Sequence, residues 1–421
     1  MNKIRSKLNS AYIKDILTSF TGTTLSQAIT IAMAPILTRI YTPSDYGLLG
    51  IYMSVTVILY VFVNLQYSQA ILLTESKEEE DNVVFLCFTI SIFYTICITA
   101  FLLLLHFFEF SFFTNAKLGY WLFLIPISIF LNGNNTLGFK LLNKYKKYKG
   151  LSISQIISSI TTVFFSLILG WMYQSYEGLL IGFLLGQLSK LVVIIIYIKN
   201  VNFNKKNITK KSLKFVIKKY KKFPIFSIPT EFLYGWTDQL PVYFFNSYGS
   251  TTIIGHFNYG KRMVSLPISF ITAAVGNVFA QKAAEQYSET GECEKLFIDT
   301  LKILSLSILP FFILLGFFAP VIFGFVFGSE WRRAGEFVQI LIPMFYLKAI
   351  VSPLSYMYII KNKQDEDLIL HLISFGLVAF SFYISYLLKS DIKTILYMFT
   401  FSYCLIYIVY LYRSYKFSLK K

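Results

Sequence analysis

Long apolar runs, separated by short polar segments, extend along almost the whole chain. A window of about 19 residues marks stretches of membrane-spanning length at 16–38, 46–73, 83–107, 118–141, 151–172, 178–198, 223–246, 252–280, 302–326, 337–360, 367–388 and 392–412. Each is long enough to cross a hydrocarbon core of roughly 30 Å, because a helix rises about 1.5 Å per residue. The pattern predicts an all-α integral membrane protein with 12 transmembrane helices.

The composition excludes a soluble protein built from domains with polar surfaces. Of the 421 residues, 55% are hydrophobic and 14% are charged, whereas soluble domains carry about 25% charged residues. The net charge of +17 is unexpected in so apolar a chain. A basic excess can mark a protein that binds nucleic acid, a membrane surface or an anionic substrate. The positions of the charges decide between these classes.

The basic residues lie mainly in alternate loops. If the N-terminus, with Lys3, Arg5, Lys7 and Lys14, is cytoplasmic, most of the 39 Lys and Arg residues fall in cytoplasmic segments. Short cytoplasmic loops of membrane proteins are enriched in these two residues. We therefore expect both termini to be cytoplasmic, and we expect no nucleic acid partner.

A lysine-rich segment midway along the chain divides it into two halves. The predicted domains are an N-lobe at 1–200 with spans 1–6, a linker at 201–222, and a C-lobe at 223–421 with spans 7–12. Within the linker, apolar residues recur at helical spacing among the lysines, namely Leu213, Val216, Ile217 and Tyr220. This pattern favours a basic amphipathic cytoplasmic helix that lies on anionic inner-leaflet lipids. A solvated linker is the alternative that the pattern leaves open.

No pattern of residues indicates a metal site, a cofactor or an enzyme. The four cysteines form no CxxC pair, and the three histidines lie on different predicted spans. The run from Gly255 to Lys261 resembles a phosphate-binding loop, but Arg262 stands where that loop requires Ser or Thr. The outer loops are short and leave no room for a catalytic domain. We therefore expect neither a metal nor a cofactor, and no enzymatic activity.

Ionisable residues inside the predicted spans are the candidates for function, because they are costly in a membrane and usually face a partner or a cavity. The cations outnumber the acids, and a surplus of positive charge suits an anion such as a phosphate or diphosphate. The substrate-binding candidates are Arg262, Lys261, Lys348, Lys190 and Asn258. The candidates for ion coupling or gating are Glu231, Asp238 and His256. An interhelical ion pair is the alternative role for each charged residue.

Arg262 is the strongest of these candidates. Its helical neighbours are polar, namely Asn258, Ser265 and Ser269, so this face of span 8 is expected to line a cavity. Lys261 has apolar neighbours at the same spacing and is expected to pair with another helix or to flank the cavity. The depth of Glu231 in span 7 also allows an ion pair with Arg262.

A resemblance to a known family begins with Leu37-Thr-Arg-Ile-Tyr-Thr-Pro-Ser-Asp-Tyr-Gly-Leu-Leu-Gly50. This motif resembles the polysaccharide exporter branch of the multidrug/oligosaccharidyl-lipid/polysaccharide (MOP) superfamily, and most of all the O-antigen flippases of the Wzx type. The likeness continues through 65–73, 143–150, 236–238 and 255–267, and the span layout extends it over nearly the whole chain. Gln66, Ser68 and Gln239 stand where the family often has charged residues, so the roles of those charges are not carried over.

The resemblance implies a flippase of the bacterial inner membrane that moves undecaprenyl-diphosphate-linked oligosaccharide repeat units, of O-antigen or capsule, from the cytoplasmic to the periplasmic leaflet. It further implies two six-helix lobes arranged in a V, alternating access coupled to an ion gradient, and a polysaccharide polymerase and chain-length regulator as partners. The alternatives are a small-molecule or drug exporter of the same superfamily and a non-transporting partner of the polysaccharide assembly machinery. The surplus of embedded cations favours the lipid diphosphate over a cationic drug.

Overall fold

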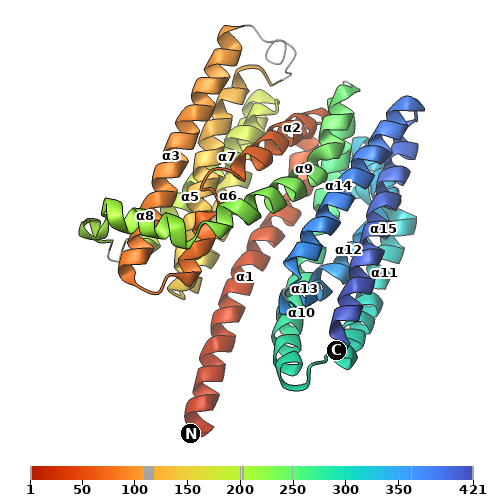
Figure 1. The fold of residues 1–421 in the computed structure, drawn as a ribbon. Coiled ribbons are helices and arrows are strands. Elements are labelled where there is room, and N and C mark those ends of the chain that lie inside the picture. The colour runs from red at the N-terminus through yellow and green to blue at the C-terminus, as the bar shows by residue number, and fades with distance from the viewer. Residues whose placement is uncertain are drawn as a thin grey trace. The chain divides into compact units, whose positions relative to one another are not determined.

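The computed structural model describes residues 2–108, 118–199, 201, 203–248, 250–361 and 363–419, and for 2–20, 270 and 274 it describes the backbone alone. Within these ranges the chain is helical and contains no strand (Figure 1). The long helices are α1 (Asn2–Ile40), α2 (Pro43–Tyr60), α3 (Lys77–Phe107), α5 (Ile125–Lys144), α6 (Tyr148–Tyr173), α7 (Glu177–Ile198), α9 (Ile228–Ser247), α10 (Thr251–Thr290), α11 (Glu294–Phe327), α12 (Arg332–Leu354), α14 (Gln364–Leu387) and α15 (Ile392–Ser418). The shorter ones are η1 (Tyr67–Leu73), η2 (Gly119–Leu124), η3 (Lys205–Asn207), α8 (Lys210–Lys219), η4 (Phe223–Ser227), η5 (Ser329–Trp331) and α13 (Met357–Ile360).

Each predicted apolar stretch overlaps one of the long helices, although 46–73 runs beyond the end of α2 at Tyr60 and across η1. Among the described residues, nine helical segments are long and apolar enough to cross a membrane, so the prediction of a multi-pass, all-helical membrane protein is confirmed. The three predicted spans outside these nine lie on α1, α2 and α9. These helices carry more polar side chains, such as Gln27 in α1 and both Glu231 and Asp238 in α9.

The chain forms two compact units, which we describe separately. The N-terminal unit comprises 1–41 and 48–232, and the C-terminal unit comprises 42–47 and 233–421. The linker, with α8, belongs to the N-terminal unit. The short segment 42–47, which opens α2 and lies in the first motif of the sequence, belongs to the C-terminal unit.

In the N-terminal unit, α7 packs closely on α6 through a stripe of glycines. Gly178, Gly182 and Gly186 repeat every four residues and so share one face of α7. A Cβ at Gly182 would lie 2.3 Å from Ser166 Oγ, and a Cβ at Gly186 would lie 1.9 Å from Thr162 Oγ1. Small residues allow helices in a membrane to approach in this way, because side-chain packing and interhelical hydrogen bonds drive their association.

In the C-terminal unit, segment 42–47 is held against the start of α10. The hydroxyls of Ser44 and Thr251 are 2.6 Å apart, and the Tyr46 ring packs edge-on against Tyr259 and Trp331. Gly255 must be a glycine here, because a Cβ would come within 1.7 Å of the Pro43 carbonyl oxygen. The first sequence motif therefore serves to pack the start of α2 against α10.

The linker helix α8 forms where the spacing of apolar residues predicts it, but half of its apolar stripe is covered by protein. Val216 and Tyr220 are buried in a cluster that contains Ile71 and Val83. Ile217 is 42% exposed. The stripe predicted to lie on the membrane surface thus contributes two of its four residues to the core of the N-terminal unit, because the ends of α3 and η1 offer an apolar surface there.

Candidate functional site

A polar pocket lies among α9, α12, α14 and α15 of the C-terminal unit. Its volume is about 250 Å³, and its ionisable lining consists of Lys348, Asp367 and His371 with four tyrosines at 234, 403, 407 and 410. Thr237, Ser352, Ser355 and Ser374 add hydroxyls. A cavity with so many hydrogen-bonding groups within apolar helices suits a polar ligand or water, because such groups are costly to bury without partners.

Asp367 and His371 line one side of the polar pocket, and Asp367 supplies its carboxylate. They lie one turn apart on α14, with His371 Nε2 3.9 Å from Asp367 Oδ1. The Tyr410 hydroxyl donates a hydrogen bond to the same carboxylate oxygen at 2.9 Å. The Tyr234 ring lies edge-on to the imidazole, with centroids 5.8 Å apart. Side chains of three helices, α9, α14 and α15, thus meet around the Asp367–His371 pair.

Lys348 is the cation of the polar pocket. It projects from α12, is half-buried, and makes no ion pair within the described parts of the chain. Lysine is a compact, strongly hydrated charge. Asp367 lines the same cavity, and Lys348 acts electrostatically on Asp238, but no carboxylate of the described chain contacts the ammonium directly. A direct contact is therefore available to an anionic ligand.

Lys261 pairs with Asp238, which joins α10 to α9. Its ammonium nitrogen lies 2.6 Å from Asp238 Oδ1, and the two side chains are 21% and 29% exposed. The Gln239 amide donates to the other carboxylate oxygen at 2.9 Å. Lys261 therefore takes the interhelical ion pair that the sequence leaves open as its alternative role.

Arg262 and Asn258 share the face of α10 on which the sequence places them. Arg262 is exposed on the C-terminal unit, and Asn258, one turn earlier, is half-buried. Arg262 makes no ion pair with any residue that the structure describes. Its guanidinium presents five fixed donors, which match phosphate oxygens well.

Of the eight candidate residues, Lys348 alone lines the polar pocket, and the face of α10 with Arg262 and Asn258 does not. Lys190 is half-buried in α7, and Glu231 is exposed in the first turn of α9; both belong to the N-terminal unit. His256 is buried against the rings of Trp331 and Phe337. Within the described residues, no hydrogen-bond partner reaches its Nδ1. None of these three contributes to the lining of the pocket.

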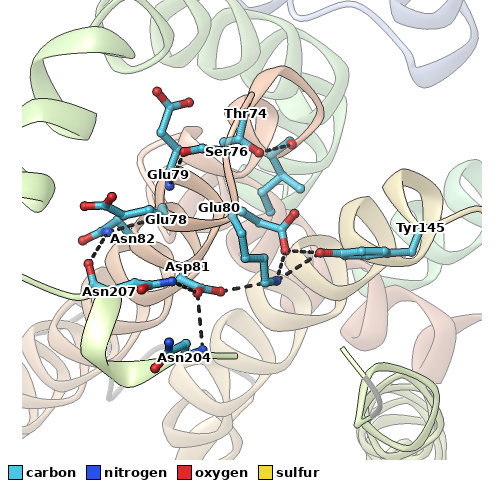
Figure 2. Close-up of polar contacts among 12 residues, drawn as sticks. Thr74, Ser76, Glu78, Glu79, Glu80, Asp81, Asn82, Tyr145, Asn204 and Asn207 are labelled. Carbon is cyan, nitrogen blue, oxygen red and sulfur yellow. Dashed lines mark hydrogen bonds and ion pairs between the residues drawn. The ribbon is translucent and has the colours of Figure 1, made fainter. Parts of the chain in front are cut away.

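A second cluster of charges, the acidic end of α3, comprises Glu75, Glu78, Glu79, Glu80 and Asp81. Figure 2 shows the last four of these. Glu80 is buried and contacts Lys77, Lys144 and the Tyr145 hydroxyl, which donates to it at 2.5 Å. Asp81, also buried, lies 3.3 Å from the Lys77 ammonium. Both carboxylates are therefore neutralised by groups of the same unit.

The acidic end of α3 also holds the linker. Asn207 donates to Asp81 at 2.8 Å, Ser212 donates to Glu78 at 2.6 Å, and Lys219 lies 2.7 Å from Glu79 (Figure 2 shows the contacts of Asn204 and Asn207). This last ion pair raises the pKa of the Lys219 ammonium. We assign this cluster a structural role, because its contacts account for its charges and tie the linker to α3.

Sequence reasoning missed Asp367, His371 and Tyr410. The available signal was the spacing of Asp367, His371 and Ser374, which places three polar side chains on one face of span 11. Asp367 is the first residue of that predicted span, and a charged residue at such a position usually marks only the end of a transmembrane helix. The pairing with Tyr410 depends on packing between α14 and α15.

Comparison with known proteins identifies the family of this chain by sequence and its fold by structure. A sequence profile of the family described as polysaccharide biosynthesis protein matches residues 36–336. No curated protein matches the chain.

Three solved structures illustrate the structural similarity. An inward-facing multidrug resistance MATE family transporter of the MOP superfamily shares 16% identity at a TM-score of 0.71, over 93% of each chain. The lipid II flippase MurJ, inward closed, shares 16% identity at 0.70, over 96% of this chain and 90% of that one. A MOP superfamily transporter from Pyrococcus furiosus shares 15% at 0.63, over 95% and 94%. At such identities the likeness establishes the fold alone. The chain has the fold of MOP superfamily transporters, and it belongs to the polysaccharide biosynthesis protein family.

Proposed function

We propose that this protein is a flippase for lipid-linked oligosaccharides. Its substrate would be an undecaprenyl-diphosphate-linked repeat unit of O-antigen or capsule, moved from the cytoplasmic to the periplasmic leaflet of the bacterial inner membrane. The membership in a polysaccharide biosynthesis family and the MOP-type fold support a transporter or flippase with this class of cargo. In this proposal the twelve spans form two six-helix lobes joined by the linker, with both termini cytoplasmic.

The observation that carries the proposal is the unequal pairing of charges in the C-terminal unit. Asp238 pairs directly with Lys261, whereas neither Lys348 nor Arg262 makes a direct ion pair within the described chain, and Lys348 acts on Asp238 only at longer range. Cations that are left unpaired at membrane depth favour an anionic ligand. Lys348 would hold the diphosphate in the polar pocket. Arg262, which does not line that pocket, would contact the diphosphate at another stage of transport, and Lys190 and Asn258 remain secondary binding candidates.

The transport cycle would expose the substrate site to one side of the membrane at a time. Glu231, Asp238 and His256 are our candidates for coupling this change to an ion gradient or for gating it. Separation of the Asp238–Lys261 pair would free one carboxylate and one ammonium in the same step. A proton or a cation would then compete with Lys261 for Asp238, and the released Lys261 would strengthen the site for the diphosphate.

Reconstituted vesicles test the proposed activity directly. The purified protein is expected to move a labelled undecaprenyl-diphosphate oligosaccharide from the outer to the inner leaflet of vesicles, or the reverse, faster than protein-free vesicles do. Equal rates with and without the protein would overturn the proposal.

Arg262→Ala tests the same activity in cells. We expect less surface polysaccharide on a gel at normal protein level, because the diphosphate loses a bidentate donor. Arg332→Ala is the matched control, since Arg332 is also exposed but lies at the start of α12. Unchanged export by the Arg262 variant would remove Arg262 from the substrate site.

Export of a small organic cation is the second candidate, and Asp367 favours it. This carboxylate lines the polar pocket and could attract a cation. Ethidium efflux, measured in the same vesicles, discriminates between the two functions. Efflux that depends on Asp367, with no movement of the lipid-linked oligosaccharide, would establish the exporter instead.

A further inference from the structure

A second cavity lies on the same pair of helices as the polar pocket. This apolar groove has a volume of about 360 Å³ and runs between the later halves of α9 and α14. Its lining is almost entirely apolar or aromatic: Leu240, Tyr243, Phe244, Ala379, Phe382 and Tyr383, with Ser247 and Tyr386 at one end. The polar pocket takes its residues from the earlier halves of the same helices, at 234 and 237 of α9 and at 367, 371 and 374 of α14.

The two cavities follow one another because α9 and α14 run parallel and in register. Tyr234 meets His371 at a centroid distance of 5.8 Å, and Phe244 meets Phe382 at 4.5 Å. On α9 the two contact residues, Tyr234 and Phe244, are ten residues apart, which is about 15 Å along the helix. On α14 the two contact residues, His371 and Phe382, are eleven residues apart, or about 16 Å. A molecule lying along this seam would meet charged groups at one end and aromatic rings at the other.

The polar end suits an anionic headgroup. Lys348 supplies a cation that makes no direct ion pair in the described chain, and the pocket adds serine and tyrosine hydroxyls as neutral donors. Asp367 lines the same pocket, but its carboxylate accepts the Tyr410 hydroxyl and lies 3.9 Å from His371 on its own helix. The volume of about 250 Å³ is small enough to exclude a large glycan. A phosphate or diphosphate group is the ligand that this combination of charge and space fits.

The apolar end suits a hydrocarbon chain, and its direction agrees with a lipid of the inner leaflet. The polar pocket lies near the start of α9, about 9 Å from Ile228 at Tyr234, and the apolar groove lies further along. With α9 entering from the cytoplasmic side, as the lysine distribution predicts, an inner-leaflet lipid has its headgroup at the pocket and its tail toward the groove. Apolar tails gain little from a groove relative to surrounding lipid, so the groove would align the tail and Lys348 would select the headgroup.

We propose that the α9/α14 seam binds one amphiphile, a prenyl diphosphate lipid, with its diphosphate at Lys348 in the polar pocket and its tail in the apolar groove. This inference rests on the proposed function and names the place where the substrate lipid is loaded. The glycan is not part of this site; it extends from the diphosphate outside the pocket.

Photo-crosslinking tests the position of the tail. The full-length protein in vesicles is irradiated with a farnesyl diphosphate analogue that carries a diazirine at the end of its tail, and the modified peptides are mapped. We expect modification to concentrate at 240–247 and 379–386. The same diazirine on farnesol is expected to modify these segments roughly tenfold less, because the alcohol lacks the charge-assisted contact to Lys348. Equal modification by both probes, or modification elsewhere, would overturn the site.

Variants of the apolar groove separate its role from a general effect on lipid binding. Ala379→Trp fills the groove and is expected to reduce tail modification about fivefold or more, the change that corresponds to roughly 1 kcal/mol of affinity. Leu372→Trp is the matched control, because Leu372 is 49% exposed on the same helix and lines neither cavity. Ala379→Leu replaces the larger substitution if the Trp variant does not elute as a folded protein. Undiminished modification in a folded Ala379 variant would contradict the proposal.

The outcome also separates this inference from the proposed function. If the probe crosslinks in the groove but the protein moves no lipid-linked oligosaccharide, the proposed lipid site is supported and the proposed flippase activity is rejected. Movement of the oligosaccharide by the Ala379→Trp variant at the wild-type rate, without crosslinking in the groove, would retain the flippase and reject the site.

Discussion

The two charged clusters of this protein differ in whether their charges are already satisfied. At the acidic end of α3, the buried carboxylates of Glu80 and Asp81 are surrounded by lysines, a tyrosine and asparagines of the same unit. In the polar pocket, Lys348 lines a cavity and has no ion-pair partner in the described chain. An ionisable residue in a membrane helix thus indicates a ligand only where a cavity is present and a charge remains unpaired.

The largest expected effect is a loss of stability at the acidic end of α3. Glu80→Ala removes the buried carboxylate that contacts Lys77, Lys144 and the Tyr145 hydroxyl at once, and each hydrogen bond to a charged group contributes about 1.5–3 kcal/mol. Chemical unfolding in detergent measures the loss. Glu75→Ala is the control, because the Glu75 side chain is 82% exposed and exposed pairs contribute about 1 kcal/mol or less. Equal effects of the two substitutions would remove the structural role that we assign to Glu80.

A smaller effect is expected at the Asp238–Lys261 pair. Asp238→Asn leaves the Lys261 ammonium without its carboxylate, and hydrogen bonds to charged groups contribute about 1.5–3 kcal/mol. The double variant with Lys261→Gln is expected to recover part of the loss, because no charge is then left unpaired. A double-mutant cycle of unfolding free energies measures the coupling. Additive losses would mean that the two side chains do not stabilise one another.

The smallest effect is expected where the linker meets α3. Lys219→Ala removes a surface ion pair with Glu79, and salt screens such pairs over a Debye length of about 8 Å at physiological ionic strength. We expect slightly faster chymotrypsin cleavage of the linker at low salt and little difference at high salt; chymotrypsin cleaves after aromatic residues, so the substitution removes no cleavage site. Lys218→Ala, an exposed neighbour with no ion pair in the described chain, is the control and should cleave as the unaltered protein does at both salt concentrations.

The same ion pair fixes the sign of a pH dependence. Because the pKa of Lys219 is raised in the folded protein, its contribution is fully present below the usual lysine pKa of about 10.4. It is lost as the pH rises through the raised value. Cleavage of the linker by a protease active in alkali should therefore be constant between neutral pH and mildly alkaline pH and should rise only above that range. A rise near neutrality would assign the linker contact to another group.

The sequence was sufficient for the positions of the helices but not for the contacts between them. Bilayer thickness imposes a length on every apolar run, so the predicted stretches overlap the long helices, and helical spacing also located α8. The stretch 46–73 is too long because α2 ends at Tyr60 and the apolar sequence continues through η1. The pairing of Lys261 with Asp238 and the approach of Tyr410 to Asp367 depend on how α9, α10, α14 and α15 pack. Residues far apart in the sequence carry no local pattern that records such packing.

The linker shows the same limit in a different way. The spacing of Val216 and Tyr220 correctly indicates an apolar helix face, but spacing does not distinguish a face turned to lipid from one turned to protein. The structure buries both residues against Ile71 and Val83. Only the acidic sequence at 75–81, opposite in charge to the lysines of the linker, gave a signal of this contact.

The central claim is that the unpaired ammonium of Lys348 binds the diphosphate of a lipid substrate, and the rate of lipid translocation by Lys348→Gln tests it most directly. The variant should lose little stability, because Lys348 makes no direct ion pair in the described chain and acts on Asp238 only at longer range. It should translocate labelled undecaprenyl-diphosphate oligosaccharide in vesicles roughly tenfold more slowly or worse, since a contact to a charged group is worth at least about 1.5 kcal/mol. Lys393→Gln, which alters an exposed lysine paired with Glu336, should keep the unaltered rate. Equal translocation rates for Lys348→Gln and the unaltered protein would contradict the account.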